Sequence, residues 1–421
     1  MAKKKKAVKT QRQMTRRQLS RWQRQKRLQR LFIGVFIFIV VAICALVLTG
    51  WYTNEYRPLQ EEVIRVNDTR FTMDYFVKAL KFYGTSANDV TQRVQENELL
   101  RQEAMHPSIG ITISDDEVTE YINSLESPLD NEYRDFISAN LLRERLFDEY
   151  IDPQVPTAAE QRHVMAMFLE SESQAVDVRS RLEAGEDFTT LAGELSCEGL
   201  TKANSGDLDW HTRDIFDMLT ESMKTDIPIE YAFNAEAGSL SEPLYDADLE
   251  KNIGYWLIKV LREENSKGKI YAQAILLGSE EEALEVRARW ESGEEDFDEL
   301  ADEVSQYDWI REGRGDLGWL ERGTVSDAFD AYAFDPETEL DVISQPIMDT
   351  GGERPTKGGY WLVRVVDVDD NRTISDDDRS ILKYQVWQDW VQSLLNDPDN
   401  IVESYLDDEK IDWAIAHATG S

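Results

Sequence analysis

The spacing of hydrophobic positions divides the chain into four stretches. Residues 31–52 contain no charged side chain, and residues 63–151 place apolar side chains every three or four positions, which is typical of amphipathic helices. From residue 156, β-branched runs with alternating apolar and polar positions are interspersed with such helices. Residues 375–395 return to a helical pattern. The pattern predicts an α+β protein in which helices pack on small antiparallel sheets.

The stretch from residue 156 to residue 372 contains one pattern twice. Each copy begins with an apolar strand and ends with a strand that starts Gly-Tyr-Trp. Matched positions are 108 residues apart at Gly185 and Gly293, 109 apart at two Gly-Asp-Leu triplets, and 105 apart at the Gly-Tyr-Trp triplets. Small insertions in loops explain this drift. Two tandem domains of one fold are therefore predicted, at residues 156–265 and 266–372.

The uncharged run at residues 31–52 is long enough to cross a membrane, because twenty helical residues span about 30 Å. Residues 1–30 carry thirteen Lys or Arg and no acidic residue. The positive-inside rule therefore places this basic tail in the cytoplasm and the rest of the chain outside the cell membrane. An uncleaved single-pass anchor is favoured over a cleaved signal peptide, whose apolar stretch would be shorter and would end at a small-residue cleavage site.

The charge of the chain is strongly asymmetric. The whole sequence carries −36, whereas the 391 residues after the basic tail hold 33 basic and 82 acidic side chains, or −49. Such a region repels nucleic acid and attracts basic or unfolded cationic segments, so no nucleic-acid partner is expected. The only two cysteines are Cys44, inside the apolar run, and Cys197, beyond it. They cannot meet in one folded chain, and no internal disulfide is expected.

The helical stretches on either side of the repeats are predicted to form one unit. Residues 53–155 include a capping box that starts at Ser114, a typical helix N-terminus. Residues 373–421 include a helix whose wide apolar face requires a partner. We expect this helix to pack on the helices of residues 53–155.

Four motifs follow one another in the first copy and recur in the same order in the second. In the first copy they are Phe188-Thr-Thr-Leu191-Ala192, Gly206-Asp207-Leu208, Ser241-Glu-Pro243 and Gly254-Tyr255-Trp256. This order resembles the parvulin, or PpiC-type, peptidyl-prolyl cis-trans isomerases (rotamases), and residues 72–151 resemble the helical N-terminal domain of the SurA, PrsA and PpiD foldases. The resemblance covers about residues 60–400, and it implies a helical SurA-N-like domain and two parvulin-like domains. It also implies that the partners are unfolded or exported polypeptides with X-Pro bonds.

Prolyl isomerisation requires no nucleophile, metal or cofactor, so none is expected. Rotation about the X-Pro bond breaks amide resonance and crosses a barrier of about 20 kcal/mol. An apolar seat for the proline ring, exclusion of water and polar groups that favour the twisted amide are sufficient to lower it. The resemblance implies two histidines on the floor of the site, a Cys or Asp beside them, and a Leu, a Met and a Phe around the proline.

Neither copy carries the full set that the resemblance implies. His163 matches the first histidine, whereas Ala274 stands at that place in the second copy, and a purely structural role for His163 is an equal alternative. Tryptophans replace the second histidine in both copies and are expected to fill the space of the lost imidazole. The candidate catalytic residues are His163, Glu198 and Asp308. The candidate substrate-binding residues are Leu208, Trp256, Leu317, Val325, Phe329 and Trp361.

Three functions fit these observations. The first is a membrane-anchored, extracytoplasmic isomerase and foldase for exported proteins, which the order of motifs favours. The second is a non-enzymatic holdase chaperone, which the missing histidines favour. The third is a membrane-anchored scaffold whose repeats bind one fixed partner.

Overall fold

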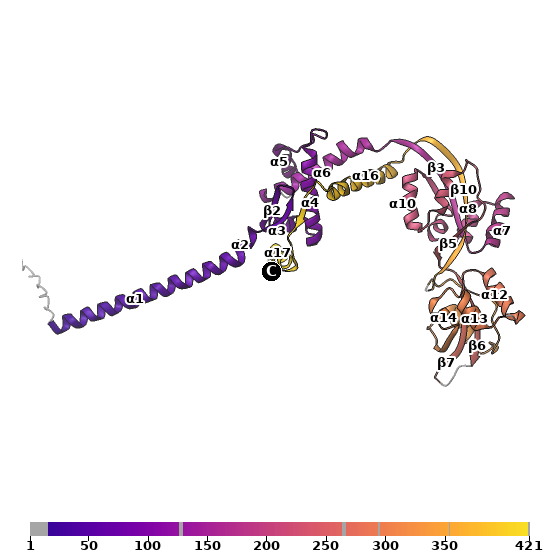
Figure 1. Cartoon of the computed structure of the whole chain (residues 1–421). Helices are drawn as coiled ribbons and strands as arrows, with labels where there is room; N and C mark the ends of the chain where they lie inside the picture. Colours follow the sequence, from indigo (N-terminus) through magenta and orange to yellow (C-terminus); the bar gives the residue numbers. More distant parts are fainter. Residues whose placement is uncertain (1–15, 126–128, 263–266, 294, 353, 420–421) are drawn as a thin grey trace, which may run out of the picture. The chain divides into compact units, whose positions relative to one another are not determined.

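The structure is a computed structural model that describes residues 16–125, 129–262, 267–293, 295–352 and 354–419 (Figure 1). It divides into two compact units. The first, unit 1, consists of residues 1–153 and 387–421, and the second, unit 2, consists of residues 154–386.

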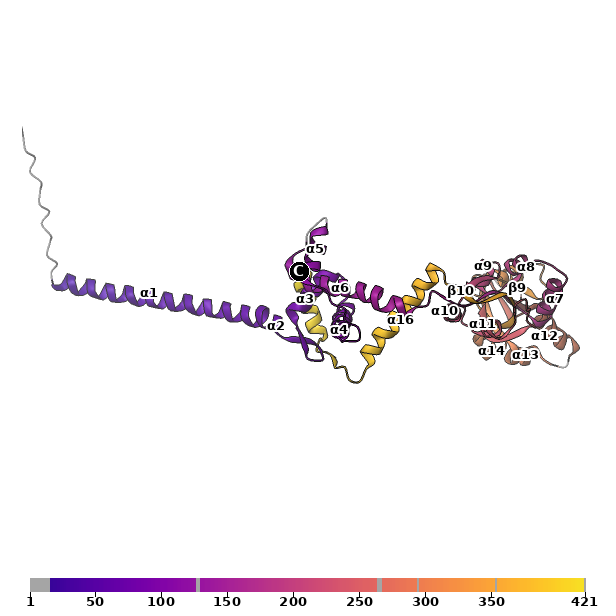
Figure 2. The same cartoon turned by 90° about the horizontal axis from the view of Figure 1, so that it is seen from above.

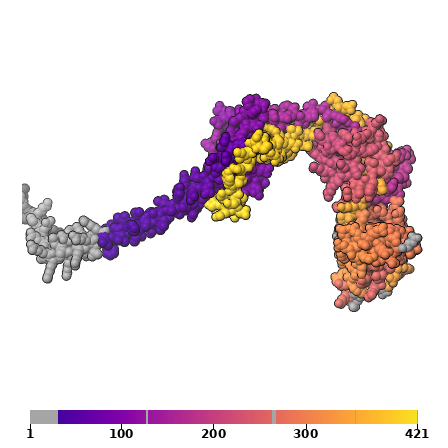
Figure 3. All heavy atoms as spheres, in the orientation of Figure 1, coloured from indigo at the N-terminus to yellow at the C-terminus, as the bar shows by residue number. Residues whose placement is uncertain are grey.

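A long apolar helix opens the described chain. Helix α1 (Arg16–Trp51) continues through the π-helical turn η1 (Tyr52–Tyr56) into α2 (Arg57–Leu59). Residues Leu31–Leu59 are long and apolar enough to cross a membrane, judged by length and composition, with a mean hydropathy of 3.3 in the most apolar window. None of that window is buried, and in Figure 3 the described part of the helix stands clear of the other described segments on the face shown. The predicted apolar helix is confirmed.

Unit 1 combines a small sheet with helices. Strand β1 pairs with β2 on one side and with β11, from the C-terminal end, on the other, where Ile64 lies opposite Ser404. Helix α17 packs against α3 (Figures 1 and 2). The elements are β1 (Glu62–Val66), β2 (Thr69–Thr72), α3 (Met73–Tyr83), α4 (Ala87–Ala104), α5 (Asp115–Ser124), α6 (Arg134–Leu146), β11 (Val402–Ser404) and α17 (Asp408–Thr419).

Local capping and aromatic packing explain why these helices form where they do. The Ser114 side chain accepts a hydrogen bond from the N–H of Glu117, and the Glu117 carboxylate accepts one from the N–H of Ser114, so the predicted capping box opens α5. Helix α16 (Asp376–Asn396) runs across the division between the two units. Within unit 1, its Trp387 ring lies edge-on to Phe147, with 5.9 Å between ring centroids.

Unit 2 is built on two four-stranded antiparallel sheets with the orders β4-β3-β10-β5 and β8-β7-β6-β9. Helices cover both faces of each sheet, and the predicted α+β class is confirmed. The strands are β3 (Ala158–Leu169), β4 (Asp207–His211), β5 (Leu244–Lys251), β6 (Gly254–Arg262), β7 (Lys269–Leu277), β8 (Asp316–Glu321), β9 (Ile347–Asp349) and β10 (Thr356–Thr373). The helices are α7 (Glu172–Glu183), α8 (Phe188–Leu195), α9 (Gly199–Ala203), α10 (Arg213–Met223), α11 (Ile227–Asn234), α12 (Glu280–Ser292), α13 (Phe297–Val304), α14 (Asp308–Glu312) and α15 (Asp327–Ala333).

The closing strands of the two repeats are exchanged. Strand β6, which ends the first repeat, pairs with β7 of the second, where Ile258 lies opposite Ala274. Strand β10, which ends the second repeat, pairs with β3 of the first, where Val363 lies opposite Ala166. Figure 1 shows the gold strand β10 beside the magenta strand β3.

This exchange corrects the division into tandem domains at residues 156–265 and 266–372. Domain A consists of residues 154–251 and 356–386, and domain B is the continuous segment 252–355. Only two residues separate β5 from β6, and the chain crosses to the next sheet there instead of turning back. Because β6 and β10 share the pattern Gly-Tyr-Trp-Leu followed by alternating apolar positions, each strand fits either sheet.

The two faces of the sheet in domain A hold separate apolar clusters. One face packs on α7 and α8 and includes Met165 and Met167. The other packs on α10 and α11 and includes Ala166 and Trp361. In domain B the sheet also has two clusters, and the face that packs on α14 and α15 includes Trp256.

Candidate active site

Two equivalent backbone hydrogen bonds show which residues of domain A and domain B correspond to each other. The N–H of Ala166 donates to the carbonyl oxygen of Gly206 at 2.8 Å, and the N–H of Ala274 donates to that of Gly315 at 3.0 Å. Both alanines are fully buried. Ala166, and not His163, is therefore the structural counterpart of Ala274, so the place of the first histidine holds alanine in both domains.

The counterpart of His163 in domain B is Tyr271. The His163 Nε2 atom lies 2.8 Å from Oδ1 of Asp207, and the Tyr271 hydroxyl donates to Oδ2 of Asp316 at 2.8 Å. Each residue thus pairs with the aspartate of its own Gly-Asp-Leu triplet. The pairing of His163 with Ala274 in the sequence comparison was wrong by three positions.

Strand alternation turns His163 away from the tryptophan cluster. The bulges near His163 lie on the neighbouring strands, so β3 itself keeps a period of two. His163 consequently shares a face with Met165 and Met167, whereas Ala166 faces the cluster of Trp361. His163 is placed to hold Asp207, and it does not lie with the residues that would enclose a proline.

The two tryptophans at the place of the second histidine are fully buried, and each indole donates to an aspartate. The Nε1 atom of Trp361 lies 3.1 Å from Oδ2 of Asp246 in domain A, and that of Trp256 lies 2.7 Å from Oδ2 of Asp349 in domain B. Each pair joins residues from different repeats because the strands are exchanged. Sequence reasoning missed both aspartates, although a Ser-x-Pro-x-x-Asp spacing occurs in each copy.

The predicted apolar residues of domain B do come together. Leu317, Val325 and Phe329 belong to one buried cluster with Trp256 and Ala274. The Phe329 ring is fully buried and lies edge-on to the Trp256 indole, with 5.6 Å between centroids. The indole therefore fills the space beside the small alanine and covers the phenylalanine.

Domain A repeats this arrangement with different neighbours. Leu208 is buried in the cluster of Ala166 and Trp361. The Trp361 indole also contacts the Phe168 ring, with 5.0 Å between centroids. A tryptophan beside an alanine thus replaces the two histidines in both domains.

The two candidate acidic residues, Glu198 and Asp308, interact with groups close to them in the sequence. The Glu198 carboxylate accepts hydrogen bonds from the N–H groups of Leu200 at 2.8 Å and Thr201 at 2.7 Å, and so caps α9. Asp308 is exposed at the start of α14, where it pairs with Arg311. Neither side chain belongs to the tryptophan clusters.

Cys197 lies in domain A at the rim of the cluster around Trp361. Burial raises the pKa of its thiol to about 11, and the nearby Glu170 carboxylate acts in the same direction. The thiolate, which is the reactive form, is therefore scarce at neutral pH.

An open pocket of about 420 Å³ lies beside Asp349 in domain B. Partial burial acts to raise the pKa of Asp349, but hydrogen bonds from Ser326, Trp256 and the Gly351 N–H outweigh it and hold the pKa below its ordinary value. Asp349 is therefore an ionised acceptor at neutral pH. The pocket is lined by Gly323, Ser326, Asp327, Ala328, Met348, Asp349, Thr350 and Gly351.

Two segments of the chain, residues 163–262 and 276–367, match the Rotamase family, described as the PPIC-type PPIASE domain. The chain is 23% identical over 322 residues to a Chaperone SurA of Alcanivorax borkumensis, covering 73% of this chain and 65% of that protein. It is 29% identical over 189 residues to a Foldase protein PrsA of Oceanobacillus iheyensis, covering 42% of this chain and 62% of that protein. It therefore spans somewhat less than two thirds of the length of these relatives.

A solved structure of peptidylprolyl isomerase (PrsA) from Bacillus cereus is 12% identical and covers 85% of this chain and 99% of that chain, with a TM-score of 0.27. The rotamase matches follow the sequence order of the repeats, each ending on a strand that the fold gives to the other domain. The chain therefore contains two segments that match the PpiC-type rotamase family, and it is similar in sequence to SurA chaperones and PrsA foldases.

Proposed function

We propose that this chain is a membrane-anchored, extracytoplasmic foldase that binds exported polypeptides and isomerises X-Pro bonds in domain B. The observation that carries the proposal is the open pocket beside Asp349, whose carboxylate accepts a hydrogen bond from the buried Trp256 indole. The rotamase matches and the foldase relatives support the same reaction class.

The pocket offers the few groups that the reaction needs. Met348 and Ala328 supply apolar contacts for a proline ring, and Ser326 and Asp349 supply polar atoms at the same wall. Rotation of the X-Pro bond moves no atom between molecules, so a site of this kind acts by binding the twisted amide better than the planar one. Without the histidine pair, we expect a modest acceleration.

The apolar helix supports the proposed location. Residues 31–52 expose large apolar side chains that water solvates poorly, and a lipid bilayer would cover them. The basic residues 1–30 would then lie in the cytoplasm against anionic lipid, and the acidic remainder would lie outside.

We further propose that residues 53–155, completed by residues 373–421, form the chaperone module that holds unfolded segments. The pairing of β11 with β1 and the packing of α17 on α3 support a single module made from the two ends of the chain.

The test is an isomerase assay on the full chain in detergent with a short Ala-Xaa-Pro peptide. Ala328→Trp places a large ring in the pocket from a partly exposed position on α15 and should abolish the acceleration. Leu284→Trp adds the same ring at a side chain that is 47% exposed on α12 of the same domain, and it should leave the rate unchanged. Equal rates for the two variants would refute the assignment of the reaction to this pocket.

A holdase without turnover is the second candidate. The indoles that fill the clusters beside Ala166 and Ala274 favour it, because they occupy the space that the resemblance assigns to the histidine pair. This candidate predicts that the full chain suppresses aggregation of an unfolded client while the isomerase assay shows no acceleration. Loss of suppression together with loss of acceleration would exclude both candidates.

A further inference from the structure

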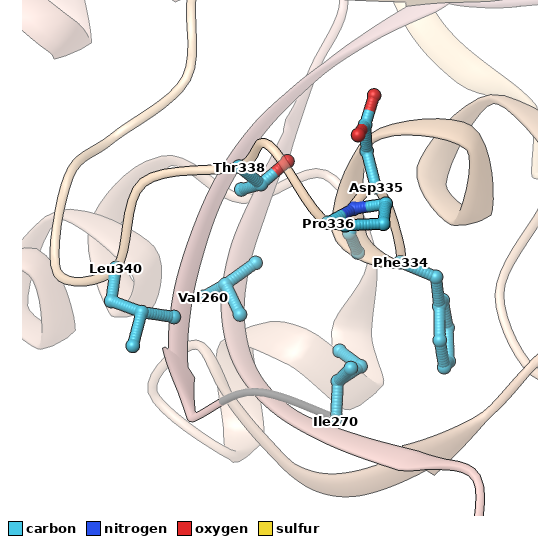
Figure 4. Close-up of a pocket in the computed structure, with 8 residues that line it drawn as sticks. Val260, Ile270, Phe334, Asp335, Pro336, Thr338 and Leu340 are labelled. Carbon is cyan, nitrogen blue, oxygen red and sulfur yellow. The ribbon is translucent and has the colours of Figure 1, made fainter.

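A second pocket in domain B lies at the other end of β6 from Trp256. It has a volume of about 250 Å³. Figure 4 shows side chains surrounding a central hollow, with Phe334 on one side and Leu340 on the other. The lining residues are Val260, Ile270, Ala333, Phe334, Asp335, Pro336, Thr338 and Leu340.

Domain A shows what the equivalent space holds. In the register that equates Ala166 with Ala274, Arg162 corresponds to Ile270. The Phe233 ring at the end of α11 corresponds to the Phe334 ring at the end of α15, because each closes a Tyr-Ala-Phe sequence. A second arginine contacts each ring. Arg213, the first residue of α10, lies near Phe233, and Arg322, directly after β8, lies near Phe334.

In domain A the space is filled by the side chain of Arg162. Its NH1 atom donates to the carbonyl oxygens of Ala232 at 2.5 Å and Ala235 at 2.8 Å. The guanidinium carbon lies 5.0 Å from the centroid of the Phe233 ring. The side chain is only 13% exposed and also pairs with Glu160. The end of α11 therefore forms a binding site for a guanidinium group, and Arg162 of the same domain fills it.

Domain B has no counterpart of Arg162, although Arg322 already lies over the Phe334 ring and donates to the Phe334 carbonyl oxygen at 3.0 Å. Ile270 is buried and has no donor, so Ala333 and Phe334 at the end of α15 line a hollow that no side chain from position 270 fills with a guanidinium group. Asp335 is exposed at the rim, and the loop that follows adds Glu337 and Glu339. The loop beside the hollow is therefore acidic, and in domain A the acidic partner of the guanidinium group is Glu160 on β3.

We propose that this pocket binds the guanidinium group of an arginine side chain from a client polypeptide, at the place where domain A holds Arg162. Arginine fits better than lysine, because a planar guanidinium stacks on an aromatic ring and donates several hydrogen bonds in one plane. The proposal rests on the proposed function only in taking the ligand to be a client. The strongly acidic region outside the membrane adds long-range attraction for the same cationic segments.

The test measures binding of the acetylated, amidated peptide Gly-Arg-Gly to the full chain in detergent by calorimetry at low salt. The matched probe is the same peptide with citrulline, which keeps the shape of arginine and lacks its charge. We expect the arginine peptide to bind at least tenfold more tightly. Ile270→Arg supplies the internal occupant and should weaken its binding at least tenfold, whereas Tyr271→Arg adds the same charge on the other face of β7 and should not.

Asp335→Lys reverses one charge at an exposed rim position and keeps the test decisive if Ile270→Arg fails to fold; it should also weaken binding at least tenfold. Equal binding of the two peptides, absence of binding at millimolar peptide, or full binding by both Ile270→Arg and Asp335→Lys would overturn the proposal. Client protection and isomerase rate are measured on the same preparations. Their loss with peptide binding intact would count against the proposed function and leave the arginine pocket standing.

Discussion

Replacing Trp256 with alanine should unfold part of domain B and spare domain A. Trp256 is fully buried, and removing a ring of this size from a core costs about 3–5 kcal/mol. Asp349 also loses the indole donor, which adds about 1 kcal/mol, because the carboxylate keeps the N–H of Gly351. Since 1.4 kcal/mol is about a factor of ten, local opening should become at least about a hundredfold more frequent.

Hydrogen exchange read by mass spectrometry locates the effect. Amides of β7 and β8 should lose protection in Trp256→Ala, while those of β3 and β4 keep it. The matched variant Trp361→Ala should give the reverse pattern, because the Trp361 indole packs on Phe168 of β3. Loss of protection in β3 and β4 on replacing Trp256 would show that each repeat keeps its own closing strand and would refute the exchange.

Three further outcomes follow from the site and from the ionisable groups. His163→Ala should leave the isomerase rate unchanged and cost less than about 1 kcal/mol, because its pair with Asp207 is partly exposed; a large loss of rate would restore a catalytic role. Cys197 should react with iodoacetamide at pH 8 far more slowly than in the unfolded chain, since its pKa is about 11, and equal rates would contradict the burial. A hydrogen bond from Arg145, with donors at the start of α5, lowers the pKa of Glu117 to about 2. Its contribution to stability is therefore complete above the ordinary value of 4.5 and is lost as the pH falls through about 2, and NMR titration of Arg145→Ala should show a higher pKa.

Local pattern accounts for the parts of the fold that were predictable. The uncharged run, the capping box at Ser114 and the short motifs inside each repeat depend on residues close together in sequence, and the structure contains the elements that they predict. The convergence of Leu317, Val325 and Phe329 was expected from the resemblance to the family, which has a Leu, a Met and a Phe at these places. Short-range patterns of this kind specify the helices, the strands and the order in which they follow one another along the chain.

Pairing between distant strands was not predictable in the same way. Strands β6 and β10 carry nearly the same sequence, so their apolar alternation cannot distinguish one sheet from the other. The register of β3 was also missed, since a visible histidine was aligned in place of Ala166, and only the hydrogen bond to Gly206 reveals the shift. Asp246 and Asp349 were overlooked because the indoles they hold come from the other repeat.

The most direct test of the account uses domain B alone. Residues 252–355 contain all four strands of one sheet and both of its apolar clusters, so this segment should fold by itself. We predict a cooperative unfolding transition and acceleration of cis-trans isomerisation in an Ala-Xaa-Pro peptide, lost in Ala328→Trp. An unfolded segment would contradict the strand exchange, and a folded but inactive segment beside an active full chain would contradict the placement of the reaction in domain B.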